Sequence, residues 1–211
     1  MARISKAPEE RRQEIIDTAQ RLFAERGFAN CSVDLIIREM GVAKGTFYYY
    51  FRTKEDVLSA IADKTLDGIL DMANAVADTP GLSAMDKMAA LLGDTHIGDE
   101  DTAAVADMLH LPGNRELHEL TNVRTVLRLS PILARIVEQG VAEGVFHTTR
   151  PLETVQFLLT GAQFLLDGGL FDFSPEEVRA RRAVVQSAIE QGLGAEPGSF
   201  HFMNPIREAS T

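Results

Sequence analysis

The sequence predicts an all-α fold. Apolar residues recur at spacings of three and four along most of the chain, which is the period of an amphipathic helix. Alternating apolar and polar residues, the pattern of a half-buried strand, are almost absent. The chain has 211 residues, of which 45% are hydrophobic, and this suffices to bury a core without a metal or a disulfide. We therefore predict about nine helices.

The first third of the chain contains four of these helices, at about residues 8–26, 33–40, 44–51 and 54–78. The first carries an apolar stripe and ends at Gly27. The second begins after Ser32, whose hydroxyl can cap a helix, and ends at Gly41. Thr53 caps the fourth helix, and Asp56 three residues later completes an acidic capping pair.

Five more helices are predicted at about residues 83–92, 102–109, 115–140, 151–167 and 175–192. Pro131 lies within the longest of them and predicts a kink or a break, because proline removes a backbone donor. Pro151 and Pro175 suit the first turns of the last two helices. The tail at residues 195–211 contains further proline and glycine and is expected to be loosely ordered.

Composition and charge restrict the class of protein. The net charge is −10, but residues 1–55 hold ten basic and eight acidic side chains, so only this part could favour a polyanion. Cys31 is the single cysteine, which excludes an intrachain disulfide and suggests a reducing compartment. We find neither a signal peptide nor an apolar run of about 20 residues. We therefore expect a cytoplasmic protein without a membrane partner.

The second and third helices are joined by a short turn at residues 41–43, which is the arrangement of a helix-turn-helix. In the third helix Phe47 and Phe51 are four residues apart and are predicted to face the core. Lys44 and Tyr48 lie on a different face, where a lysine can reach guanine and a phenol can bind phosphate. The flanking positions hold Gly45, Thr46, Tyr49 and Tyr50. The alternative is that the tyrosines pack at a domain seam, but three successive tyrosines cannot all point into one core.

Residues 41–57, which read GVAKGTFYYYFRTKEDV, resemble the TetR family of bacterial transcriptional regulators. Tyr49 departs from the family pattern, because many members carry histidine there. The resemblance implies a homodimeric repressor that a small organic ligand releases from a near-palindromic double-stranded DNA operator. It places Lys44 and Tyr49 near the DNA bases. It implies that the DNA phosphates or backbone are held by Ser32, Thr46, Tyr48, Tyr50 and Lys54. Arg3, Lys6, Arg11 and Arg12 are expected to add contacts to the DNA backbone. The alternative is that they form a solvated, flexible arm.

The resemblance also implies a division into a DNA-binding domain at residues 1–52 and a ligand-binding and dimerisation domain at residues 53–194. Dimerisation would occur through the last two helices, as a four-helix bundle about a two-fold axis. The stripes predicted to form this interface are Leu152, Val155, Leu159, Ala162 and Leu166, followed by Val178, Val185 and Ala188. An ordinary core stripe is the alternative.

A ligand cavity is expected among the middle helices, because adaptable methionine and aromatic walls with a few polar groups suit a small organic molecule. The predicted lining residues are Met72, Met88, Met108, His110, Leu111, His118, Asn122, Arg124, Phe157 and Phe164. The alternative for each apolar member is ordinary core packing.

No pattern typical of an enzyme is found. The chain lacks a phosphate-binding glycine loop, and its five histidines have no tight ligand spacing, so no catalytic residue, cofactor or metal site is predicted. Two other functions stay open at this point: a helical interaction module that does not bind DNA, and a regulator controlled by a protein partner.

Overall fold

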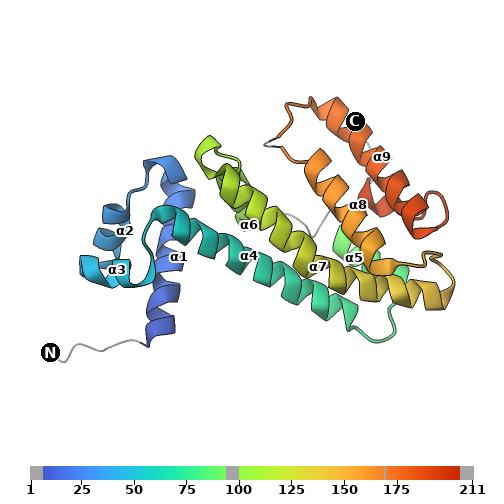
Figure 1. Cartoon of the computed structure of the whole chain (residues 1–211), viewed down its shortest axis with the longest axis horizontal. Coiled ribbons are helices and arrows are strands. Elements are labelled where there is room, and N and C mark those ends of the chain that lie inside the picture. Colours follow the sequence, from blue (N-terminus) through green and yellow to red (C-terminus); the bar gives the residue numbers. More distant parts are fainter. Residues whose placement is uncertain (1–6, 94–99, 169, 205–211) are drawn as a thin grey trace, which may run out of the picture.

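The computed structural model describes residues 7–93, 100–168 and 170–204. Within these ranges the regular elements are nine α-helices and three short 3₁₀ helices, so the predicted all-α fold is confirmed. The α-helices are α1 (Pro8–Arg26), α2 (Val33–Met40), α3 (Lys44–Tyr50), α4 (Lys54–Ala77), α5 (Ala84–Leu92), α6 (Glu100–Leu109), α7 (Arg115–Glu143), α8 (Pro151–Leu165) and α9 (Pro175–Leu193). Figure 1 shows an elongated molecule with α1 to α3 at one end and α8 and α9 at the other.

The N-terminal end, which we call the head, is built on a core that extends beyond α3. Phe47 and Phe51 are buried there together with residues of α1, as predicted. The same cluster includes the first half of α4, through Ile61, and the buried face of α6, including Met108 and Leu109. The predicted domain boundary after residue 52 therefore precedes the part of α4 that completes the core of the head.

Helix α4 connects the head to the C-terminal part. Its second half packs in a separate cluster with α5, α7, α8 and α9. Three ion pairs join α4 and the residue that caps its end to the neighbouring α7: Asp63 to Arg124 at 2.7 Å, Asp67 to Arg128 at 2.6 Å and Asp78 to Arg135 at 2.9 Å. Each pair is partly exposed and adds little stability by itself.

The break predicted at Pro131 does not occur, because α7 runs without interruption from Arg115 to Glu143. Pro131 is exposed, and so is Leu127, whose carbonyl loses its helical donor to the proline. That carbonyl therefore lies on the solvent side of the helix. The neighbouring Ile132 and Leu133 are buried and hold the helix against the C-terminal core.

The prediction of a loosely ordered tail is wrong for residues 195–204. Phe200 is fully buried, and its ring lies 6.0 Å from that of Phe146. Glu190 on α9 accepts hydrogen bonds from the backbone N–H groups of Gly198 at 2.9 Å and Phe200 at 3.0 Å. A buried carboxylate and a buried aromatic ring thus anchor this segment, whereas residues 205–211 lie outside the described ranges.

Replacing Glu190 with glutamine is expected to destabilise the protein by about 1.5–3 kcal/mol at neutral pH. Burial by itself raises the pKa of Glu190, but the hydrogen bonds from Gln186, Gly198 and Phe200 outweigh it and hold the pKa below its ordinary value of 4.5. The ionised group therefore stabilises the fold above about pH 4.5, and this contribution is lost as the pH falls through the lowered pKa.

Urea unfolding at several pH values checks this expectation. The wild type should lose stability on acidification more steeply than Glu190→Gln does. The control is Glu196→Gln, which changes an exposed carboxylate of the same segment. Equal acid sensitivity in the wild type and Glu190→Gln would contradict the role given to this carboxylate.

Candidate nucleic-acid interface and ligand cavity

Helices α2 and α3 meet in a tight turn. The Ser32 hydroxyl caps α2 by accepting a hydrogen bond from the N–H of Leu35 at 3.2 Å, and Gly41 ends the helix at a φ of +64°. This left-handed conformation costs glycine little, so the chain can turn at once into α3. Ile36 on α2 and Phe47 on α3 are both fully buried in the core of the head. Their burial fixes which side of α3 faces outward.

The outward side of α3 carries a cation and two phenols. Tyr49 is 78% exposed and Tyr48 is 45% exposed, whereas Tyr50 is half-buried and packs against the core. The Lys44 ammonium is exposed and lies 3.2 Å from a carboxylate oxygen of Asp34. Gly45 is also exposed and adds no side chain. The face therefore offers hydrogen-bond donors at the surface of a short helix that is narrow enough to enter a major groove.

Lys54 does not occupy the position predicted for it. Its ammonium donates hydrogen bonds to the carbonyls of Phe28 at 2.9 Å and Cys31 at 3.2 Å, and it lies 4.3 Å from the centre of the Phe28 ring. These carbonyls lie at the first residue of the short 3₁₀ helix Phe28–Asn30 and at the residue that follows it. Lys54 therefore ties the start of α4 to this turn rather than presenting its charge to a phosphate.

The predicted basic arm is described only in part. The guanidinium of Arg12 lies 5.3 Å from the centre of the Phe51 ring, and Arg11 pairs with Glu14. Arg12 therefore contacts the residue that ends α3, and Arg11 is paired within α1. Arg3 and Lys6 lie outside the described residues.

The C-terminal part contains an apolar cavity of about 110 Å³ between α5, α7, α8 and α9. Met88 lines it, as predicted. Phe200 and Met203 of the tail close one side, which the sequence analysis did not anticipate. The other lining residues are Leu92, Leu133, Val155, Leu158, Leu159, Ala162, Ile189 and Leu193. Such a wall favours an apolar molecule or an apolar part of one.

Several residues of α8 lie on a different face from the one predicted. Val155, Leu159 and Ala162, which were predicted to contact a second subunit, line the cavity within the chain. Phe157 and Phe164 were predicted to line the cavity. Phe157 is 80% exposed, whereas Phe164, although 57% exposed, lines with Asn122 a second, mostly apolar pocket of about 210 Å³ between α7 and α8. Both stripes are apolar, so the periodicity of α8 alone could not decide which of them faces inward.

The remaining predicted cavity residues are dispersed. Met108 belongs to the core of the head, Met72 packs against the C-terminal cluster, and Leu111 is exposed. Arg124 forms its ion pair with Asp63 and also lies within hydrogen-bond distance of Ser59. None of these four side chains reaches the apolar cavity.

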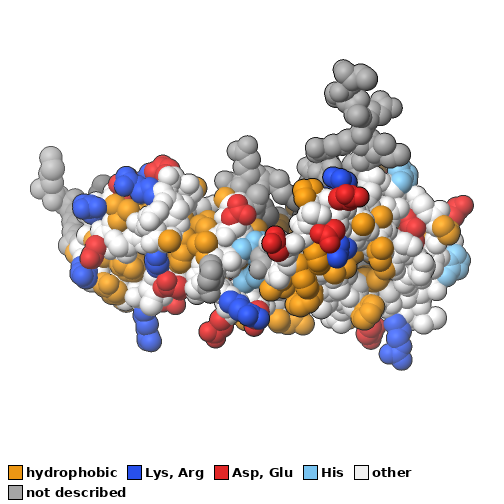
Figure 2. Space-filling view, turned by 90° about the horizontal axis from the view of Figure 1, so that it is seen from above, with side chains coloured by type: hydrophobic (Ala, Val, Ile, Leu, Met, Phe, Trp, Pro, Cys, Tyr) orange, Lys and Arg blue, Asp and Glu red, His pale blue; other side chains and the backbone are white. Residues whose placement is uncertain are grey.

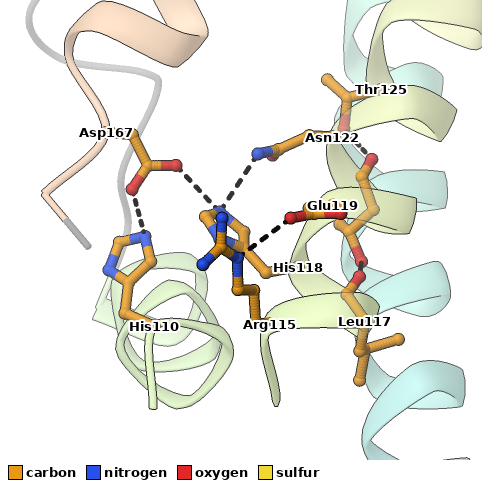
Figure 3. A network of polar contacts seen from close by, with 9 residues as sticks. His110, Arg115, Leu117, His118, Glu119, Asn122, Thr125 and Asp167 are labelled. Atoms are coloured by element: carbon orange, nitrogen blue, oxygen red, sulfur yellow. Dashed lines mark hydrogen bonds and ion pairs between the residues drawn. The ribbon is translucent and has the colours of Figure 1, made fainter. Parts of the chain in front are cut away.

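His110, His118 and Asn122 lie together in a polar cluster (Figure 3). Asp167, which follows α8, lies between the two histidines. Its carboxylate oxygens are 3.2 Å from Nε2 of His110 and 2.9 Å from Nε2 of His118, and the Asn122 amide nitrogen is 3.2 Å from Nε2 of His118. Burial lowers the pKa of His118, and the neighbouring Asp167 carboxylate only partly offsets this effect. The sequence analysis missed Asp167, because it is remote in sequence from both histidines.

Helices α8 and α9 leave apolar side chains on the surface. Phe157, Gly161 and Phe164 of α8 are exposed at a spacing of three to four, and so are Val184 and Ala188 of α9. Figure 2 shows hydrophobic side chains at the surface of both halves of the molecule, including the half that holds these helices. Of the other residues predicted for the interface, Leu152 is exposed, Leu166 and Val178 are half-buried and Val185 is buried.

Among the described residues, no helix combines the length and the apolar character needed to cross a bilayer.

Comparison with known proteins identifies the family. The model for bacterial regulatory proteins of the tetR family matches residues 15–61, and the model for the tetracyclin repressor-like C-terminal domain matches residues 100–188. A curated relative is the HTH-type transcriptional repressor KstR2 of Rhodococcus jostii, 28% identical over 148 residues, or 68% of this chain and 71% of the relative. Another is the fatty acid metabolism regulator protein of Bacillus subtilis, 29% identical over 135 residues, or 62% and 68%.

Solved structures agree with these matches. A transcriptional regulator of the TetR/AcrR family from Thermobifida fusca superposes with a TM-score of 0.58 at 28% identity, covering 94% of this chain and all of that one. The fatty acid degradation regulator FadR from Bacillus halodurans superposes with a TM-score of 0.58 at 20% identity, covering 97% of this chain and all of that one, and it supports the fold. The matched head, the exposed face of α3 and the helical C-terminal part lead to one conclusion: the chain belongs to the TetR family of bacterial transcriptional regulators, which bind DNA and are not enzymes.

Proposed function

We propose that this protein is a homodimeric repressor that binds a near-palindromic operator through α3 and leaves it when a small, largely apolar ligand enters the C-terminal cavity. The observation that carries the DNA-binding part is the face of α3, where Lys44, Tyr48 and Tyr49 are exposed although their neighbour Phe47 is fully buried. A surface of this kind is suited to base edges and phosphates. Such a repressor would work in the bacterial cytoplasm.

The functional division that we propose follows the predicted one, with α4 as the link. Residues 1–52 read the operator, and residues 53–194 bind the ligand and the second subunit. Helix α4 contributes to both cores, so a displacement of its second half is transmitted to the head. A ligand that moves α4 against α7 would change the separation of the two heads, which then no longer matches successive major grooves about 34–36 Å apart.

The ligand class follows from the cavity wall. Its lining residues are apolar, and Met88 and Met203 are flexible enough to let a volume of about 110 Å³ expand. Two relatives are named for fatty acid metabolism or degradation, which is consistent with a ligand that has an acyl chain. To release the operator, the ligand must bind the released conformation more tightly than the operator-bound conformation, by about 1–3 kcal/mol.

Exposed apolar residues on α8 and α9 support the proposed dimer. A helix that is apolar on two sides is stable in water only when both sides are covered, and α8 covers one side within the chain. Phe157 is the most exposed large hydrophobic side chain among the described residues. The two-fold axis would place it and Val184 against the same face of the partner.

Replacing Phe157 with aspartate is expected to dissociate the dimer, because an unpaired charge in an apolar interface leaves a strong desolvation penalty. Sedimentation velocity over a range of protein concentrations measures the effect. The control is Leu82→Asp, which places the same charge at an exposed leucine between α4 and α5. If both variants keep the oligomeric state of the wild type, the proposed interface is wrong.

Selection from random duplex DNA with the purified protein tests the proposed function. Enrichment of a palindromic motif, with affinity that falls steeply as the salt concentration rises, is the expected result. Absence of any motif above non-specific binding would overturn the assignment of α3 as the reading helix. Thermal shift in the presence of fatty acids then tests the ligand, and the fatty acids that stabilise the protein should also release the selected operator.

A further inference from the structure

Three side chains that are typical metal ligands converge at the junction of α6, α7 and the segment after α8. His110 follows α6, His118 lies on the first turns of α7, and Asp167 follows α8. One ligand atom from each residue lies within 4.8 Å of the other two. Figure 3 shows the carboxylate of Asp167 between the two imidazoles, both of which present Nε2 to it. None of these residues lines the apolar cavity.

The donor set and its geometry suit a first-row divalent ion. Two imidazole nitrogens and one carboxylate oxygen are ligands that Zn²⁺ accepts, with bonds of about 2.0–2.2 Å. In a tetrahedral site such bonds place neighbouring ligand atoms about 3.3 Å apart. The Nε2 atoms of His110 and His118 are already 3.2 Å and 2.9 Å from the Asp167 oxygens, so small side-chain movements would enclose an ion.

The three side chains are also buried and accessible to the degree that a metal site requires. The side chain of Asp167 is only 4% exposed and that of His118 only 10%, so both ligands are held by their surroundings. The His110 side chain is 25% exposed and leaves a route from solvent. The amide nitrogen of Asn122 lies 3.2 Å from Nε2 of His118, the proposed ligand atom, so this contact would have to give way to the ion.

We propose that His110, His118 and Asp167 form a binding site for a divalent transition-metal ion of the Zn²⁺ type. The three residues leave a fourth coordination position for water or for a donor atom of a small molecule. The ion would take the place of the protons that the imidazoles share with the carboxylate. The site is separate from the apolar cavity and does not depend on which ligand that cavity takes.

The position of this site connects it to the head. Met108 and Leu109, which immediately precede His110, are buried in the core of the head, and Asp167 follows the helix that carries Phe157. A bound ion would therefore fasten the end of α6 to α7 and to the segment after α8. Because linkage is reciprocal, an ion that binds the operator-bound and released states differently must change operator affinity.

Metal titration of the full chain, without an affinity tag, tests the site. We expect one Zn²⁺ per chain in competition with a chromophoric chelator, and a Co²⁺ complex with the absorption of a low-coordinate nitrogen and oxygen site. Asp167→Asn and His110→Gln keep similar shapes and should each weaken Zn²⁺ binding by about 10- to 100-fold or more. His201→Ala, at an exposed histidine of the same part of the molecule, should bind like the wild type.

Circular dichroism of the metal-free variants establishes that they fold, so that a loss of binding can be assigned to the site. Equal Zn²⁺ affinity in the wild type, Asp167→Asn and His110→Gln would overturn the proposal. So would the absence of Zn²⁺ and Co²⁺ binding to the wild type, which would leave the three residues as a hydrogen-bonded connection between helices.

A second measurement tests the connection to the head, and this part rests on the proposed function. Zn²⁺ should change the operator affinity of the wild type by about fivefold or more and leave that of Asp167→Asn unchanged. An unchanged affinity of metal-loaded wild type would overturn the connection. A protein that binds Zn²⁺ but no DNA sequence would instead contradict the proposed function, so the two failures are distinguishable.

Discussion

Replacing Phe47 with alanine is expected to unfold the head, at a cost of about 3–5 kcal/mol in the free energy of unfolding. Phe47 is fully buried, and its ring lies 6.1 Å from that of Phe51 and 5.5 Å from that of Tyr48. The ring joins α3 to α1 and α4, so its removal leaves a cavity where three helices meet. A helix of seven residues cannot stay folded without this packing.

Urea unfolding followed by circular dichroism measures this loss. The matched control is Tyr49→Ala, because it removes an aromatic ring from the same helix at a position that is 78% exposed. Tyr49→Ala should stay close to the wild type in stability. If Phe47→Ala unfolds at the same urea concentration as Tyr49→Ala, the core position of Phe47 is wrong.

Replacing Lys44 or Tyr49 with alanine is expected to weaken operator binding by about 1–3 kcal/mol each, while the fold stays intact. Both side chains are exposed on α3, and neither belongs to the core of the head. The ion pair between Lys44 and Asp34 is exposed on both sides, so breaking it costs little and leaves the lysine available to DNA. Fluorescence anisotropy with the selected operator measures the change.

Lys64→Ala is the control for Lys44→Ala. It removes the same charge and a similar exposed ion pair, between Lys64 and Asp17, but on α4 rather than on α3. A base contact by Lys44 predicts relaxed preference at one operator position, whereas a phosphate contact predicts a uniform loss and a smaller salt slope. If Lys44→Ala and Lys64→Ala lower affinity equally, the loss reflects net charge, and α3 does not read the operator through Lys44.

Local signals determined most of the secondary structure. Ser32 and Thr53 cap α2 and α4 as the sequence predicts, because a capping hydroxyl needs only the N–H groups of the next turn. The outward face of α3 was also predictable. Once Phe47 and Phe51 are assigned to the core, the 3.6-residue period fixes the direction of Tyr49.

Contacts between distant segments were not predictable in this way. Lys54 reads as a surface cation in the sequence, and only the fold brings its ammonium to the carbonyls of Phe28 and Cys31. The tail reads as a loop rich in proline and glycine, and only α9 supplies the Glu190 carboxylate that holds Phe200 in the core. Lys54, Glu190 and Phe200 have no neighbours in the sequence that would indicate these long-range contacts.

By itself, the sequence determined the helices, the helix-turn-helix, the family and the exposed face of α3, since these depend on neighbours within one or two turns. Only the tertiary structure decided which apolar side of α8 faces the cavity, because Val155 and Phe157 are equally apolar and the choice depends on α7 and α9. It also decided that Asp167 lies between His110 and His118. The physical reason is the same in both cases: burial and coordination depend on distances between helices, which the period of a single helix does not contain.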